Sequence, residues 1–146
     1  MFVGDILDNK AAGVISVTPD QTMVEVLQLF RDNNIGFVIV SRSPGEYLGT
    51  LSERDCCNMV AEYGAEAPMM RAADIMNRRV AICSTHDTLP LVMAIMTELR
   101  TRHVLVRDGN ALVGVVSIGD VVKHRLDESL HTQQLLHDYI CGVAYH

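Results

Sequence analysis

The chain repeats one pattern of residues, and this internal repeat limits the fold more than any other feature of the sequence. Residues 14–22 read VISVTPDQT and residues 80–88 read VAICSTHDT, which places the two copies 66 positions apart. After a one-residue difference in a turn, the spacing becomes 65 and pairs Gly49 with Gly114. Because loops tolerate small changes of length, this slip is typical of a duplicated unit. The sequence therefore predicts two matched units within 146 residues.

Each unit is expected to form a β-α-β-β-α arrangement, so the predicted fold class is α/β (α+β). One helix in each unit has apolar residues at positions i, i+3, i+4 and i+7, a spacing that buries one helix face. These residues are Met23, Val26, Leu27 and Phe30 in the first unit and Leu89, Val92, Met93 and Met96 in the second. The predicted strands are 14–17, 37–41 and 47–51, then 80–83, 103–107 and 112–116, and further helices begin at Ser52 and Ser117.

The repeat divides the chain into four predicted segments. A first repeat covers 1–65, a linker covers 66–71, a second repeat covers 72–128, and a helical extension covers 129–146. Apolar residues continue as far as Ile140, and Gly142 suits the end of a helix. This long C-terminal helix exceeds what one repeat can cover, so we expect its apolar side to contact a second copy of the chain.

The charge of the chain argues against a broad nucleic-acid surface. Eighteen acidic and 12 basic residues give a formal net charge of −6, and a negative protein repels a phosphate backbone. The sequence has no apolar run near the ~18 residues that a membrane span needs. Asp5 and Asp8 stand where a signal peptide carries positive charge. We therefore expect a cytoplasmic protein with no nucleic-acid or membrane partner.

The four cysteines show no spacing typical of a zinc site or a disulfide framework. They are Cys56, Cys57, Cys83 and Cys141, and adjacent cysteines rarely close a relaxed disulfide. We interpret all four as reduced thiols that fill small apolar spaces. A redox role for the adjacent pair is the alternative. The histidines show no paired metal spacing either, so no metal site is predicted.

Two equivalent segments carry groups that suit a nucleotide. Ser52 and Asp55 stand at one strand-to-helix junction, and Ser117 and Asp120 stand at the other. A helix start offers N–H groups and a positive dipole end to a phosphate, while an aspartate accepts hydrogen bonds from a ribose diol. The glycine three residues before each serine would let a planar group approach the sheet. The same Ser-x-x-Asp pattern is also a helix capping box, and both interpretations can apply in different ligand states.

With these motifs in order, the chain resembles a tandem pair of cystathionine-β-synthase (CBS) domains, also called a Bateman module, over about residues 3–127. The resemblance is greatest to small stand-alone bacterial CBS-pair proteins. It rests on Ser52–Asp55, on Arg102-His103 and on Val116–Lys123. It implies two β-α-β-β-α repeats that pack through their sheets with pseudo-two-fold symmetry.

The resemblance also implies that adenosine nucleotides bind in clefts between the repeats. Ser117 and Asp120 would hold one nucleotide, and Ser52 and Asp55 would hold another. The implied adenine contacts are Val17, Thr18 and Pro19 in one site and Ile82, Cys83 and Thr85 in the other, and the implied phosphate contacts are Lys10, Arg54, Arg102 and His103. The first repeat lacks an Arg-His pair, so the Ser117 site is expected to be the stronger. Arg102 near a helix end and His103 at a core edge also have structural interpretations.

The expected function is that of a regulatory adenine-nucleotide sensor, with no catalytic residue and no required cofactor. AMP, ADP, ATP, NAD and S-adenosylmethionine all fit the implied site. Binding would change how the repeats pack, and an effector protein would respond to the change. We also expect a homodimer that forms through the CBS helices and the C-terminal helix. The alternatives are a structural or partner-binding protein with vestigial pockets, and a nucleotide-processing enzyme that uses Asp55 or Asp120 with His103.

Overall fold

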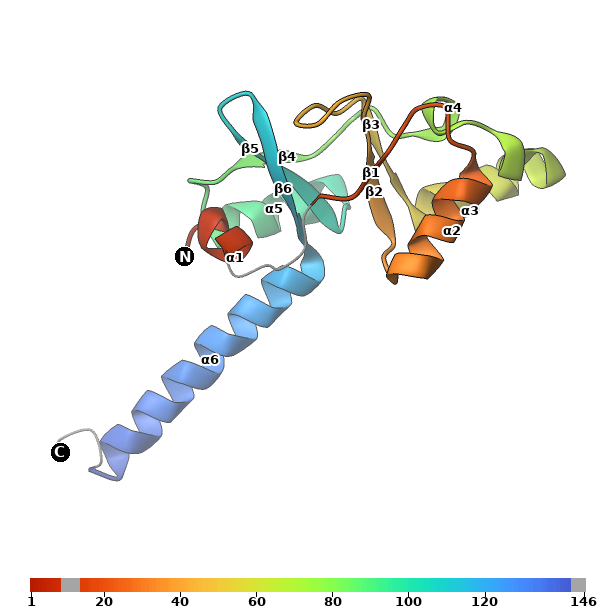
Figure 1. Ribbon diagram of the computed structural model, residues 1–146. Coiled ribbons are helices and arrows are strands. Elements are labelled where there is room, and N and C mark those ends of the chain that lie inside the picture. The colour runs from red at the N-terminus through yellow and green to blue at the C-terminus, as the bar shows by residue number, and fades with distance from the viewer. Residues whose placement is uncertain (9–13, 143–146) are drawn as a thin grey trace.

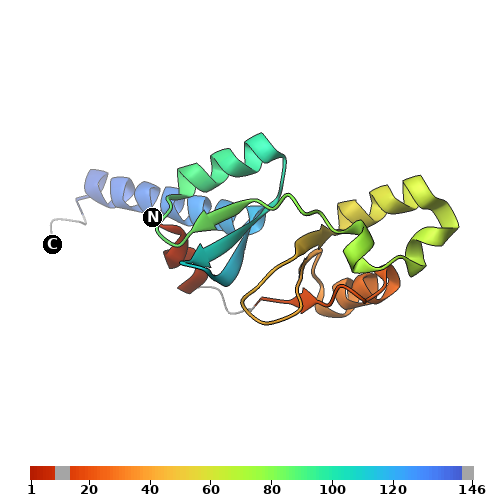
Figure 2. The same ribbon diagram turned by 90° about the horizontal axis from the view of Figure 1, so that it is seen from above.

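The protein is built from two units, each with a three-stranded sheet and covering helices (Figures 1 and 2). The computed structural model describes residues 1–8 and 14–142. In chain order the elements are α1 (Val3–Asp8), β1 (Ser16–Val17), α2 (Met23–Asn33), β2 (Phe37–Val40), β3 (Gly49–Ser52), α3 (Glu53–Tyr63), the 3-10 helix η1 (Gly64–Met69), α4 (Ala72–Ile75), β4 (Ile82–Ser84), α5 (Leu89–Leu99), β5 (His103–Asp108), β6 (Ala111–Ser117) and α6 (Ile118–Ile140). The sheet orders are β1-β2-β3 and β4-β5-β6. The predicted α+β fold with two β-α-β-β-α repeats and a long C-terminal helix is confirmed.

The first strand of each sheet is shorter than the sequence predicts. β1 pairs in parallel with β2, with Ser16 opposite Ile39, and β4 pairs in parallel with β5. The residues just before these strands keep one hydrogen bond each to the neighbouring strand. The N–H of Ile39 donates to the carbonyl of Ile15 at 3.3 Å, and the N–H of Leu105 donates to the carbonyl of Ala81 at 2.8 Å. These two segments therefore stay beside β2 and β5 without forming a full ladder.

Each unit is completed by a short helix that precedes the other unit's sheet in the chain. α1 lies against the β4-β5-β6 unit, and α4 lies against the β1-β2-β3 unit (Figures 1 and 2). The N–H of Gly4 donates to the carbonyl of Thr85 at 3.0 Å, and the N–H of Ala73 donates to the carbonyl of Pro19 at 3.0 Å. Thr85 and Pro19 are equivalent positions of the repeat. Each half of the chain therefore gives its first short helix to the other unit in the same way. Neither core is complete within one contiguous half of the sequence.

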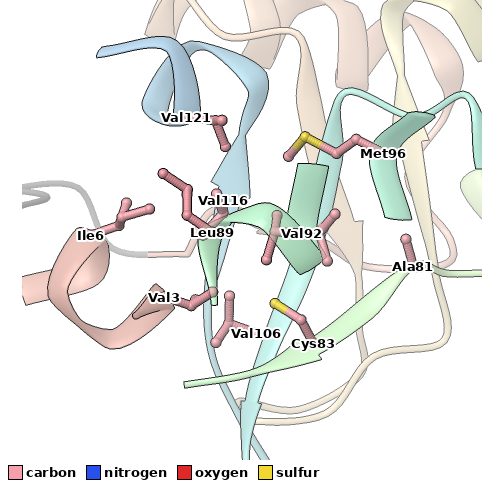
Figure 3. Packing of buried hydrophobic residues seen from close by; sticks show 11 residues of the cluster. Val3, Ile6, Ala81, Cys83, Leu89, Val92, Met96, Val106, Val116 and Val121 are labelled. Atoms are coloured by element: carbon pink, nitrogen blue, oxygen red, sulfur yellow. The ribbon is translucent and has the colours of Figure 1, made fainter. Parts of the chain in front are cut away.

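The core of the second unit shows this exchange at the level of side chains (Figure 3). Val3 and Ile6 of α1 are 0% and 1% exposed, and they belong to one cluster with residues of α5 and the second sheet. The first unit has the matching cluster, in which Ala72 and Ile75 of α4 pack with residues of α2 and the first sheet. The apolar side chains of the two short helices therefore hold the two halves of the chain together.

Gly49 of β3 and Gly114 of β6 lie where another segment of the chain comes close to the strand. The residues around α1 and α4 leave no space there for a side chain. A Cβ atom on Gly49 would lie 2.7 Å from the carbonyl oxygen of Asn77, and one on Gly114 would lie 2.8 Å from Cδ2 of Leu7. At Gly49 the approach includes two backbone hydrogen bonds between Thr50 and Asn77, of 2.9 and 2.8 Å. The expectation that these glycines admit a planar ligand group is therefore corrected, because the chain's own segments take that space.

The two glycines give a matched test of this packing. Gly49→Ala is expected to lower the free energy of unfolding by about 2–3 kcal/mol, because its methyl group would meet a backbone carbonyl that hydrogen bonds hold in place. Gly114→Ala should cost less than about 1 kcal/mol, since the end of the Leu7 side chain can turn away. Urea unfolding of both variants measures the difference. Equal losses would contradict the packing described at Gly49.

The helix α6 extends well beyond the second unit (Figure 1). Among its side chains, Val121 is buried in the core, whereas the apolar residues of its outer part are more than half exposed. They are Leu126, Leu130, Leu135, Leu136, Tyr139 and Ile140. The described residues contain no helix whose length and hydropathy would let it cross a bilayer.

Candidate functional site

The serine and aspartate of each Ser-x-x-Asp motif cap the last helix of their unit. In the first unit, Ser52 Oγ accepts the N–H of Asp55 at 3.2 Å, and Asp55 Oδ2 accepts the N–H of Ser52 at 2.9 Å. In the second, Ser117 Oγ accepts the N–H of Asp120 at 3.1 Å, and Asp120 Oδ2 accepts the N–H of Ser117 at 2.8 Å. The capping interpretation is therefore confirmed for this state. All four side chains are half-buried, so solvent still reaches them.

Two aromatic rings connect the capped helix ends across the boundary between the units. Phe37 and His103 are equivalent positions of the repeat, and their rings stack with centroids 4.1 Å apart and planes 9° apart. Phe37 lies opposite Ser52 in the first sheet, and His103 lies opposite Ser117 in the second. The ring pair therefore places the N-termini of α3 and α6 on either side of one contact between the two units.

A cavity lies on each side of this ring pair. The first, which we call the Ser117 cavity, has a volume of about 290 Å³. Its lining includes Leu7, Val14, Ile15, Phe37, His103 and Ser117. The second, which we call the Arg79 cavity, has a volume of about 610 Å³. Its lining includes Phe37, Thr50, Asn77, Arg79, Glu98, Thr101 and His103.

The two cavities are related by the repeat but differ in chemistry. Val14 in the Ser117 cavity corresponds to Val80 in the Arg79 cavity, and Ile35 corresponds to Thr101. The described lining of the Ser117 cavity is mostly apolar. The Arg79 cavity has a guanidinium, a carboxylate and two threonine hydroxyls in its lining. The Ser117 cavity would therefore favour an apolar part of a ligand, and the Arg79 cavity would favour a polar or charged part.

The structure brings seven of the predicted site residues to the ring-pair end of the sheets. Besides the two serines and two aspartates, these are Arg54, Arg102 and His103. The carbonyl of Arg102 accepts the N–H of Ile118 at 2.8 Å, which fixes the backbone of Arg102 at the start of α6. Its side chain is exposed, as is that of Arg54 in the first turn of α3. Of the predicted residues, Ser117 and His103 line a described cavity.

Five of the six residues implied for adenine lie at the other end of the sheets. They are Val17, Thr18, Pro19, Cys83 and Thr85, and they flank the ends of β2 and β5 that lie away from Phe37 and His103. The sixth, Ile82, pairs with Leu105 in the middle of β5, and Leu105 lines the Arg79 cavity. Val17 and Cys83 are 2% and 5% exposed. The carbonyl of Val17 already accepts the N–H of Ser41 at 2.9 Å. Lys10, the remaining predicted phosphate contact, lies outside the described residues.

Sequence reasoning missed five polar residues of the Arg79 cavity: Thr50, Asn77, Arg79, Glu98 and Thr101. Asn77 Oδ1 accepts the N–H of Arg79 at 3.0 Å, which fixes the backbone that carries the guanidinium. The repeat could have indicated this region, because Val80 is the equivalent of Val14 and the two valines line the two cavities. The residues just before them, which include Asn77 and Arg79, could not be aligned, because the two copies differ in length there.

A family model for the CBS domain matches the chain twice, at residues 3–62 and 72–127. The chain belongs to the CBS-domain family. The two matches fall on the two copies of the sequence repeat, and each includes the short helix, α1 or α4, that packs in the other unit.

Other CBS proteins share both the sequence and the fold. A CBS-domain-containing protein from Agrobacterium tumefaciens is 38% identical in its solved structure, with a TM-score of 0.82 over 86% of this chain and 99% of that chain. A mitochondrial CBS-domain-containing protein of Arabidopsis thaliana is 29% identical over 96% of this chain and 72% of its own length.

Two more distant CBS structures contain ligands. A CBS protein from Pyrobaculum aerophilum, in complex with AMP, is 24% identical with a TM-score of 0.71 over 82% of this chain and 89% of its own. The CBS pair of the protein MJ0100, in complex with 5′-methylthioadenosine and S-adenosyl-L-methionine, is 19% identical with a TM-score of 0.76 over 88% of this chain and 98% of its own. At these identities, the likeness to the present CBS pair is one of fold.

The cysteines of the CBS pair fall into two classes. Cys56 and Cys83 are buried, whereas Cys57 and Cys141 are exposed, and all four are free thiols. The prediction that they fill apolar space therefore holds for the buried two and is wrong for the exposed two. Burial raises the pKa of Cys56 to about 11, and the carboxylate of Asp55 adds to the effect. Burial also raises the pKa of Cys83 to about 11, with a contribution from Asp87.

This difference predicts the order of thiol modification. At pH 8 we expect Cys57 and Cys141 to react with iodoacetamide well before Cys56 and Cys83, because the thiolate is the reactive form and burial suppresses it. Peptide mass spectrometry at several reaction times measures the order, and a sample in urea, where all four should react, is the control. Reaction of Cys56 as fast as Cys57 would contradict the burial described here.

Proposed function

We propose that this CBS pair is a regulatory module that binds an adenine nucleotide, or a related adenosine ligand, between its two repeats. The observation that carries the proposal is the position of Ser117. Its hydroxyl caps α6 and also lines a cavity to which both repeats contribute residues. Binding at this point would act on both repeats together. The ligands in the distant CBS structures, AMP and two adenosine thioether compounds, support the ligand class.

The helix ends supply the groups that a phosphorylated ribose requires. The N-terminus of a helix favours an anion because its first N–H groups and its dipole point toward it. Ser117 and Asp120 now satisfy two of those N–H groups. A bound ligand could replace one of these contacts, so that the hydroxyl donates to a phosphate oxygen and the carboxylate accepts from ribose hydroxyls. Ser52 and Asp55 have the same geometry at α3.

The Arg79 cavity offers a second set of contacts for such a ligand. Arginine binds phosphate oxygens through a planar fork of N–H donors, and the side-chain hydroxyl and amide of Thr101 and Asn77 lie in the same lining. Glu98 would accept hydrogen bonds from an amino group or a ribose hydroxyl. We therefore propose Arg79 as a phosphate contact alongside Arg54, Arg102 and His103.

We propose that the ligand is bound rather than converted. The cavity linings supply hydrogen-bond donors, acceptors and apolar walls, which are groups suited to recognition. No cluster of three or more metal-ligating side chains occurs among the residues that the structure describes. The effector that responds to binding would be another protein.

A structural role without ligand is the second candidate, and one observation favours it. Each Ser-Asp pair is satisfied by its own helix end, so neither pair requires a ligand for its hydrogen bonds. In that case the clefts would be vestigial and the module would act through partner contacts alone.

A ligand panel separates these candidates. Thermal unfolding of the full chain would be followed with AMP, ADP, ATP, NAD, S-adenosylmethionine and 5′-methylthioadenosine, with guanosine monophosphate as the control. The proposal expects a saturable rise in Tm with one or more adenosine compounds and a smaller rise with the guanosine control. No rise with any of them favours the structural role, and the appearance of product in the same samples would contradict a non-catalytic module.

We also propose that the chain is a homodimer through its repeat helices and the outer part of α6. Six exposed apolar residues on that part of the helix support it, since burying such side chains on association is favourable. Leu130→Asp combined with Leu136→Asp should weaken the dimer at least tenfold in sedimentation velocity. His131→Asp, a charge change on the side of the same helix turned away from Leu130 and Leu136, is the control. A monomer in the wild type, or an equal effect of both changes, would contradict the proposal.

A further inference from the structure

The Phe37–His103 ring pair separates the Ser117 cavity from the Arg79 cavity. These two residues occur in the lining of both cavities, and no other described residue does. Each cavity also has its own walls, with Ser117 in one and Arg79 in the other. The ring pair is thus a common wall with one ligand site on each side.

The two rings of the pair are in direct contact. The centroids lie 4.1 Å apart with planes 9° apart, which is close contact for two stacked rings. A ligand that pushes Phe37 away from one cavity presses it against His103 and so reshapes the other. Where the two rings touch, no free volume separates them, so a displacement of one ring toward the other is transmitted to it.

Both rings are also tied to the helix ends that carry the predicted ligand groups. Phe37 begins β2 opposite Ser52, and the residue before it, Gly36, accepts the N–H of Glu53 at 3.0 Å. His103 begins β5 opposite Ser117, and Thr101 holds its backbone through bonds of 3.0 and 3.3 Å. A ligand that shifts either capped helix end therefore shifts a ring of the pair.

We infer that the ring pair couples the two cavities, so that a ligand in one changes the affinity of the other for its own ligand. The inference rests on the proposed function, because it requires both cavities to bind. It goes further in making Phe37, which no sequence motif singled out, the residue that transmits binding between the sites. Coupling of this kind is reciprocal, since each ligand must change the affinity for the other by the same factor.

The test uses AMP and 5′-methylthioadenosine as two probes of the full chain. The Kd for AMP would be measured by calorimetry at rising fixed concentrations of 5′-methylthioadenosine, and then the reverse. We expect each Kd to change by at least about fivefold, to reach a plateau, and to give the same factor in both directions. A Kd that rises without a plateau shows competition for one site and overturns the inference. Two Kd values that do not respond to each other overturn it too.

Variants of Phe37 test whether the rings carry the coupling. Phe37→Leu removes the stack and should bring the coupling factor to within about twofold of one, while Phe37→Tyr keeps a ring and should keep the factor. Phe30→Leu is the matched control, because Phe30 is buried in the first core, lines neither cavity and should leave the factor unchanged. Phe37→Ile replaces Phe37→Leu if circular dichroism shows that the leucine variant does not fold.

The outcomes also distinguish this inference from the proposed function. If neither probe binds the wild type, both proposals fail. If both probes bind independently, the proposed function stands and the coupling fails. Coupling that survives in Phe37→Leu shows that another route connects the cavities and overturns the role given to the ring pair.

Discussion

Asp120→Ala is expected to lose most of the ligand-induced rise in Tm that the wild-type protein shows. A ligand present at 100 times its Kd adds about 2.7 kcal/mol of stability, which is a rise of roughly 5–10 °C for a domain of this size. Without the carboxylate at the start of α6, we expect a rise below about 2 °C. The variant should also lose about 1 kcal/mol of its own stability, because Asp120 accepts the N–H of Ser117 in the capping box.

Asp87→Ala is the matched control for this loss. Asp87 Oδ2 accepts the N–H of Ser84, three residues earlier, at 2.7 Å, which is the same local bond as that between Asp120 and Ser117. Ser84 ends β4, at the end of the sheet away from the ring pair. We expect Asp87→Ala to lose a similar amount of stability, here from a turn rather than a helix cap, and to keep the full ligand response. A response that persists unchanged in Asp120→Ala would contradict the assignment of the ligand to the start of α6, and a response that disappears in Asp87→Ala would place the ligand at the other end of the sheet.

Ile6→Ala is expected to destabilise the protein by about 3 kcal/mol, although Ile6 lies near the N-terminus in a helix of six residues. The reason is that Ile6 is 1% exposed in the core of the second unit, more than 70 residues away in sequence from its partners Val92 and Val116. Urea unfolding measures the loss. Met69→Ala, at a position 71% exposed in η1, should cost little and serves as the control. Similar losses for the two would show that α1 does not complete the second core.

The order of elements could be predicted because each element has a local signal and the signals occur twice. The spacing of Met23, Val26, Leu27 and Phe30 predicts a helix with one buried face. Three of the four are buried in α2, and Leu27 is 38% exposed. The exchange of α1 and α4 could not be predicted in this way. The apolar residues Ile6 and Ile75 indicate burial, but no local pattern states which sheet they cover.

The site was predictable where chemistry and local structure coincide. Ser117 and Asp120 combine a helix start with hydrogen-bonding groups, and the repeat of the pattern at Ser52 and Asp55 strengthens the prediction. Phe37 carries a weaker signal, because the repeat aligns it with His103 but an aromatic residue at the start of a strand is also typical of a core. Its role depends on a contact with His103, 66 residues away, which exists only in the folded chain. Arg79 was missed for a similar reason, since only the folded chain shows that it lines a cavity.

The central claim, that an adenosine ligand binds between the repeats, is tested most directly by a crystal structure of the full chain grown with a saturating adenosine ligand from the panel. The account predicts electron density for the ligand in the Ser117 cavity, the Arg79 cavity or both, in contact with the Phe37–His103 ring pair. Density at the opposite end of the sheets, beside Val17 or Cys83, would contradict it, as would two cavities that stay empty although the ligand binds in solution.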